Sequence, residues 1–362
     1  MNPLKFIALL LVSSAVIFGC DPEEMEQGDL MNITYQPESY TFDLPAHFPK
    51  MEIPTNNPMT NQGILLGRHL FYDPILSADS TMSCSSCHLP ELNFTDGKAF
   101  SKGIDGLNGT RSSMSLINIG FVQAGLFWDG RAKTLEDQAL FPVEDPIELH
   151  NTWPNVINKL KRHVVYPKMF REAFGINDRS EITKELAAKA IAQFERTLVS
   201  KDSKFDKESY SDLELLGYGL FFDDDPDLPD TECGHCHNIP MTSSDDFFNN
   251  GLSEAATLDD FKDLGRGKIT GSKSDNGKFR APTLRNIKYS APYMHDGRFA
   301  TIDDVIAHYK SGAKSSPTKD PLLHKLDIED HHIQALKAFI DTFTDTLFYK
   351  NPEFDIVYYK IL

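Results

Sequence analysis

Apolar residues recur every three or four positions in two long segments, and this spacing predicts two amphipathic helices. Residues 180–200 form the first segment, with Ser180 as a candidate N-cap, and residues 327–343 form the second. The apolar positions are Ile182, Leu186, Ala190, Phe194 and Leu198, then Ile333, Leu336, Phe339, Ile340 and Phe343. Strictly alternating patterns are scarce, so we expect an all-α fold. Residues 42–58 and 265–277 are rich in Pro or Gly and predict long ordered loops.

The N-terminus carries an apolar run that is too short to span a membrane. Its thirteen positions, 6–18, would cover about 20 Å as a helix, against about 30 Å of hydrocarbon in a bilayer. Gly19 and Cys20 follow, which predicts a lipoprotein-type export signal over 1–20 and a lipidated Cys20 that anchors the protein to a membrane surface. The alternative is ordinary cleavage that leaves a free thiol. Residues 21–45 then form an acidic lead or tether, and the protein is expected in the periplasm or cell envelope.

Several motifs occur twice, the upstream ones 149 or 150 residues apart and the downstream ones 167 or 168 residues apart. LLGRHLFYD with Gly67 is repeated as LLGYGLFFD with Gly217, 150 residues later. SLINI at 115–119 returns as TLRNI at 283–287, and WDGRAKTLEDQ at 128–138 returns as HDGRFATIDDV at 295–305. This repetition predicts a tandem duplication. We place the N-terminal domain at 46–208, the C-terminal domain at 209–350 and a tail at 351–362.

Four of the five cysteines lie in two copies of a CxxCH motif, CSSCH at 84–88 and CGHCH at 233–237. A chain of this length with 40% apolar residues needs no disulfide scaffold. A structural zinc site is an alternative, but the histidine after each second cysteine has no special place in zinc spacing. The pattern is typical of c-type haem attachment, in which the thiols form thioethers and the histidine binds iron. It assigns one haem to Cys84, Cys87 and His88, and another to Cys233, Cys236 and His237.

Net charge narrows the range of partners. The chain has 53 acidic and 36 basic residues, a formal charge of −17, which argues against nucleic-acid binding.

The motifs together resemble the bacterial dihaem cytochrome c peroxidase family, including its MauG-type branch. The likeness rests on both CxxCH sites, FWDGRA, LEDQA, PVEDPIEL, APTLRN and APYMHDG, and runs from about Gly63 to Gly312. It implies two cytochrome-c-like domains with one covalent haem c each. The first haem would reduce hydrogen peroxide, and the second would pass or store the oxidising equivalents that peroxide supplies. A small cytochrome or a protein substrate would donate the electrons. Alternatives are MauG-type oxidation of a protein or other substrate, a dihaem electron-transfer cytochrome and a haem-based sensor.

The resemblance also implies roles for residues around the first haem. Glu148 matches the catalytic glutamate, the expected general acid–base for cleaving the O–O bond. Gln138 matches a glutamine that orients peroxide, and Trp128 a tryptophan between the haems that relays electrons. No histidine lies between His88 and His150, so we expect an open first haem that needs no reductive activation. Met114 is the methionine of that interval, in a segment where the family turns toward the domain interface.

At the second haem, the chain departs from the methionine-type pattern. Fourteen residues after His295 the methionine is replaced by Tyr309, as in MauG-type enzymes, and a phenolate ligand favours the oxidised iron. Met294, His308 or an open site are the alternatives. A calcium ion between the domains is a further family feature, with Ser113 and the carbonyls of Ser290 and Pro292 as its expected ligands.

Overall fold

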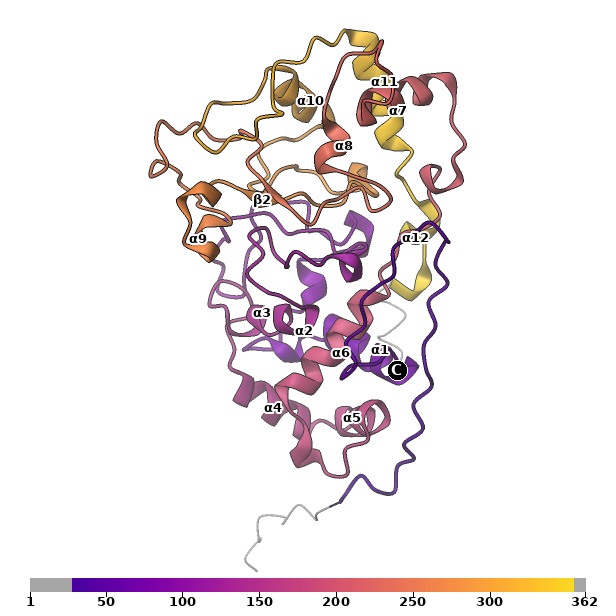
Figure 1. Ribbon diagram of the computed structural model, residues 1–362. Helices are drawn as coiled ribbons and strands as arrows, with labels where there is room; N and C mark the ends of the chain where they lie inside the picture. Colours follow the sequence, from indigo (N-terminus) through magenta and orange to yellow (C-terminus); the bar gives the residue numbers. More distant parts are fainter. Residues whose placement is uncertain (1–27, 355–362) are drawn as a thin grey trace, which may run out of the picture.

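The computed structural model describes residues 28–354, and its helices form two groups stacked end to end in Figure 1. The first group is α1 (Asn61–Tyr72), α2 (Leu135–Gln138), α3 (Phe141–Glu144), α4 (Trp153–Arg162), α5 (Tyr166–Phe174) and α6 (Lys184–Arg196). The second is α7 (Asp212–Phe222), α8 (Cys233–Cys236), α9 (Gly267–Thr270), α10 (Ile302–Lys310) and α11 (Asp330–Asp341), followed by α12 (Thr346–Tyr349). Two-residue strands β1 (Phe247–Phe248) and β2 (Phe279–Arg280) pair antiparallel between the groups. The prediction of a helical fold is confirmed.

Each half pairs its first long helix with its last, α1 with α6 and α7 with α11. The repeated glycines lie at these two crossings. A Cβ on Gly67 would stand 1.8 Å from the carbonyl oxygen of Ala190, and one on Gly217 would stand 2.1 Å from that of Ala335. The LLGxxLF repeat is therefore explained by close helix packing, because only glycine lets the backbones approach so far.

The expected helices are present, but the first begins later than predicted. Residues 179–181 form a 3-10 turn, and the Ser180 amide donates to the Asp178 side chain. Thr183 is the N-cap of α6, and its hydroxyl accepts from the Leu186 amide. Ser180 as the N-cap was therefore wrong. Residues 42–58 are irregular as expected, whereas 265–277 contain the short helix α9.

Each half has its own apolar core, but residues near the end of the chain pack into the core of the first half. One cluster lies among α1, α4, α5 and α6, and another joins α7 to α11. Phe348 and Phe354, late in the chain, pack instead with Phe71 and Phe94 of the first half. The last described residues thus complete the first core, while the domain limits remain a prediction.

From Gly28 onward, the N-terminal lead packs against the loop between α5 and α6. Leu30 is buried, its amide donates to the Asn177 carbonyl, and Asp29 forms an ion pair with Arg179. Cys20 and the predicted export signal lie outside the described residues, as does the end of the tail. None of the helices in 28–354 is long and apolar enough to cross a membrane.

Candidate haem sites and catalytic residues

The first motif opens with a 3-10 turn, Cys84–Ser86, capped by Ser83. Cys84 and Cys87 are free thiols. Burial raises the pKa of both, that of Cys87 to about 11, so the thiols are protonated at neutral pH. Two partly buried thiols three residues apart are the groups that haem c attachment consumes.

His88 is oriented by two backbone carbonyls. Its Nδ1 donates to the Phe94 carbonyl oxygen at 2.8 Å, and the Met114 carbonyl is a second acceptor. Burial lowers the pKa of His88, which keeps the imidazole neutral. Because Nδ1 is used, Nε2 is the nitrogen left to bind iron.

The second motif repeats this arrangement on α8. His237 Nδ1 donates to the Thr242 carbonyl oxygen at 3.2 Å, with the Pro282 carbonyl as second acceptor. Cys233 and Cys236 are free thiols, and burial raises their pKa values to about 11 and about 12. Both donor sets therefore fit haem c.

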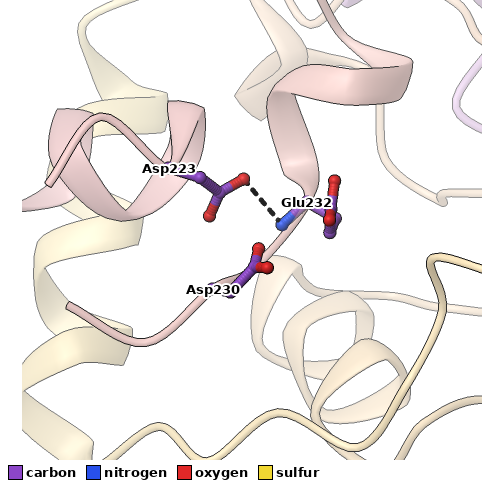
Figure 2. A group of neighbouring side chains, drawn as sticks. All are labelled: Asp223, Asp230 and Glu232. Carbon is purple, nitrogen blue, oxygen red and sulfur yellow. Dashed lines mark hydrogen bonds between the residues drawn. The ribbon is translucent and has the colours of Figure 1, made fainter. Parts of the chain in front are cut away.

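The loop before Cys233 is held by an acidic group. Figure 2 shows Asp223, Asp230 and Glu232 close together. The Asp223 carboxylate accepts from the amides of Thr231 at 2.8 Å and Glu232 at 3.1 Å. Burial, together with Asp230, raises the pKa of Asp223 to about 6. The Asp223 carboxylate thus fixes the backbone of the loop that immediately precedes Cys233.

Glu148 lies beside the first motif. Its amide donates to the Asp145 carbonyl and its carbonyl accepts from Ile104, so both neighbouring loops fix its backbone. Burial is the main cause of the raised pKa of Cys84 and of Cys87, and the Glu148 charge raises both pKa values further, so the carboxyl lies in the neighbourhood of both thiols. Burial, and to a lesser extent Asp145, raises the pKa of Glu148 to about 7.

The Glu148 carboxyl makes no hydrogen bond or ion pair with any residue of 28–354. The side-chain amide of Gln138, at the end of α2, is likewise without a hydrogen bond in this part of the chain. Both groups are half-buried. Polar groups in such positions are available to a ligand.

Trp128 lies at the boundary between the halves. Its indole Nε1 donates to the Ser112 carbonyl at 2.9 Å, and its own carbonyl accepts from the Arg280 amide of β2. Its ring contacts His295 edge to face, with centroids 6.3 Å apart. Trp128 thus touches both halves, the position that a relay residue requires.

Met114 is held on the side of His88. Its carbonyl is an acceptor for His88, as that of Pro282 is for His237, and the two residues are 168 positions apart, the offset of the SLINI and TLRNI repeat. The Met114 sulfur accepts from Arg280 at 3.6 Å. Met114 therefore lies beside His88 through its carbonyl and beside Arg280 through its sulfur.

The candidate ligands of the second haem gather around Asn250. Its side chain hydrogen-bonds to Tyr309 and donates to the Met294 sulfur at 3.3 Å, and its carbonyl accepts from His308 Nε2 at 2.9 Å. Burial raises the pKa of Tyr309, the Asn250 bond opposes this, and both Cys236 and Cys233 raise it further. Tyr309 is therefore close to the second motif. The preferred ligating nitrogen of His308 is already used.

The predicted calcium ligands come from two segments that meet where the Ser112 hydroxyl donates to the carbonyl of Met294. The Ser113 hydroxyl donates to the Cys87 carbonyl at 2.7 Å, within the first motif. The Ser290 hydroxyl donates to its neighbour Ile287, and Pro292 follows a cis peptide bond. The calcium site stays a prediction.

Comparison with known proteins decides the family. Residues 61–214 match the model of the di-haem cytochrome c peroxidases. The cytochrome-c peroxidase IdrP1 of Denitromonas iodatirespirans is 32% identical over 340 residues, which cover 84% of this chain and 88% of that protein. The chain belongs to the di-haem cytochrome c peroxidase family.

Two further members show the breadth of this family. The methylamine utilization protein MauG of Methylorubrum extorquens is 31% identical, with 80% of each chain covered. The crystal structure of a MauG-like protein associated with microbial copper homeostasis superposes with a TM-score of 0.78 at 32% identity, covering 88% of this chain and all of that one. Membership makes the protein a peroxidase-like oxidoreductase, and the family implies haem c cofactors.

Three residues of this dihaem peroxidase were missed by sequence reasoning. Asn250 contacts every candidate ligand of the second haem, Glu195 is buried beside Cys84, and Arg280 is buried between the halves. Asn250 and Arg280 lie in no motif that was recognised, and Glu195 falls in the regular pattern of α6. Only their neighbours in space distinguish them.

Proposed function

We propose that this enzyme reduces hydrogen peroxide at a haem c on the first motif, with Glu148 as general acid–base. The observation that carries the proposal is an unpaired, half-buried Glu148 carboxyl with a pKa of about 7 beside Cys84 and Cys87. Cys84, Cys87 and His88 would hold one haem, and Cys233, Cys236 and His237 the other. The haem irons supply the electron exchange with peroxide.

Glu148 moves the proton that O–O cleavage requires. The carboxylate takes a proton from the inner oxygen of peroxide, and the resulting acid gives it to the outer oxygen, which leaves as water. A pKa near 7 populates both forms at neutral pH, which suits a group that must accept and then donate. The free amide of Gln138 would orient the peroxide.

Tyr309 is proposed as the sixth ligand of the second haem, and Trp128 as the relay between the halves. Tyr309 is supported by its closeness to Cys233 and Cys236 and by the Asn250 hydrogen bond, which favours the phenolate. Met294 also accepts from Asn250 through its sulfur and stays the alternative, but only Tyr309 is in addition influenced by the charges of Cys233 and Cys236. An anionic oxygen ligand favours the oxidised iron, so the second haem would store oxidising equivalents.

The setting of the enzyme is proposed from the sequence. Covalent haem attachment and the N-terminal signal favour an extracytoplasmic protein, with Cys20 as lipid anchor. A small cytochrome or a protein would donate the electrons. A calcium ion at Ser113, Ser290 and Pro292 is part of the same proposal.

MauG-type oxidation of a protein or other substrate is the second candidate. Tyr309 beside the second motif favours it, together with the likeness to a MauG-like crystal structure. Turnover of peroxide with reduced small cytochromes, compared with turnover with candidate protein substrates, separates the two.

Two substitutions test the residue assignments. Glu148→Gln should keep both haems attached and slow the reaction with peroxide about 10²- to 10⁴-fold, the usual contribution of general acid–base catalysis. Glu144→Gln, an exposed acid on the neighbouring α3, is the control and should react as wild type does. Stopped-flow spectroscopy measures both rates.

Tyr309→Phe should change the spectrum of the second haem alone. An unchanged spectrum would mean that Tyr309 is not the ligand. An unchanged rate in Glu148→Gln would remove Glu148 from the chemistry.

A further inference from the structure

Three arginines are almost completely buried, and two of them have a carboxylate partner. Arg285 is 0% exposed and donates to both oxygens of Asp206, at 2.7 and 2.6 Å. Arg196 is 4% exposed and donates to both oxygens of Glu136, at 2.8 and 3.0 Å. Such two-point pairing compensates a guanidinium for the water it has lost.

Arg280 is the third, and it has no such partner. It is 4% exposed, and its Nη2 donates to the Met114 sulfur at 3.6 Å, a weak acceptor. Its Nε has no hydrogen-bond partner, and no carboxylate of residues 28–354 forms an ion pair with it. Burial lowers the pKa of Arg280 to about 10, and the charge of Asp245 opposes this. A buried, uncompensated cation is costly, so the site is incomplete without an anion.

The position of Arg280 indicates which anion completes it. Arg280 lies on β2, between the halves in Figure 1, and its amide donates to the Trp128 carbonyl. Its sulfur partner Met114 holds His88 through a carbonyl, and Pro282, two residues further on, holds His237 in the same way. Arg280 thus contacts the segment that holds His88 through its guanidinium and lies two residues from the segment that holds His237. Haem c carries two propionates, and a carboxylate is the anion that a guanidinium binds at two points.

We propose that the Arg280 guanidinium binds a propionate of one of the two haems. The inference rests on the proposed function in one respect, that haem c occupies both motifs. It adds a cofactor-binding residue that ties the β2 hairpin, Trp128 and a haem into one unit. Removing the positive charge would leave the propionate uncompensated and stabilise the ferric form of that haem.

The test is a spectroelectrochemical titration of the holoprotein with both haems attached. In Arg280→Met the midpoint potential of one haem should fall while that of the other stays, and in Arg280→Lys the fall should be smaller because the charge is kept. Arg266→Met is the matched control. Arg266 also reaches the Trp128 loop, but it donates to the carbonyls of Asp129 and Gly130 and is not buried.

The haem whose potential moves identifies the propionate, and either haem supports the proposal. Unchanged potentials in Arg280→Met, or an equal shift in Arg266→Met, would overturn it. If Arg280→Met cannot be recovered folded, Arg280→Gln, which also removes the charge, decides, and wild-type potentials there would overturn the proposal. Haem content, measured by the pyridine haemochrome, shows separately whether both motifs carry haem, and the potentials do not depend on peroxide chemistry.

Discussion

Glu195 should make the stability of the enzyme fall as pH rises. It lies on α6, is 4% exposed, and its Oε2 has no hydrogen-bond partner. Burial raises the pKa of Glu195 to about 8, Arg196 opposes this and Glu136 adds to it. The folded protein therefore keeps the proton that the unfolded chain releases near its ordinary pKa of 4.5.

The sign and size follow from proton linkage. A pKa raised on folding gives stability that is fully present below pH 4.5 and is lost as the pH rises to about 8. At about 1.36 kcal/mol per pKa unit, the loss between about pH 5 and about pH 8 is roughly 3 to 4 kcal/mol. Glu195→Gln removes the titrating group and keeps its shape. The variant should match wild type near pH 5 and be more stable near pH 8 by that amount.

Urea denaturation of the holoprotein at the two pH values measures the difference. Glu185→Gln is the matched control, because Glu185 is an exposed acid on the same helix. It should leave the pH dependence as in wild type. A Glu195→Gln variant that is equally destabilised at both pH values would refute the reasoning, because it would show that Glu195 is charged and paired in the folded enzyme.

Two further predictions concern the frame of the two halves. Gly67→Ala and Gly217→Ala should each lower the free energy of unfolding in urea by about 1–3 kcal/mol or more, because the added methyl meets a helix backbone. Gly109→Ala is the control and should cost little, because its Cβ would make only ordinary contacts. Equal costs at all three positions would contradict the helix-crossing role. Asp206→Asn should cost about 3–5 kcal/mol by leaving Arg285 buried without its counter-charge, and a loss below about 1 kcal/mol would show that water reaches this pair.

Local sequence patterns predicted the features that depend only on residues close together in the chain, namely the CxxCH motifs and the helices. The CxxCH spacing located both haem motifs, and the periodicity located α6 and α11. The likeness to the family selected Glu148, whose unpaired carboxyl lies beside the first motif. The apolar pattern predicts Ser180 as the N-cap because this residue precedes the pattern. Thr183 caps α6 instead, because its hydroxyl accepts from the Leu186 amide in the first turn of the helix.

Contacts between distant segments could not be predicted in this way. Arg280 meets Met114 across 166 residues, and Phe354 joins the core of the first half from the far end of the chain. A buried arginine without a carboxylate cannot be recognised in a sequence, because the missing partner is a property of the space around it. The same holds for Asn250, whose importance lies in the three candidate ligands it touches.

The central claim is that the first haem is open and served by Glu148 in the resting enzyme. The most direct measurement is stopped-flow absorbance after hydrogen peroxide is added to the fully oxidised wild-type protein, without any reductant. The account predicts a prompt spectral change, slowed about 10²- to 10⁴-fold in Glu148→Gln. A wild-type protein whose absorbance does not change on addition of peroxide until one haem has been reduced would contradict it.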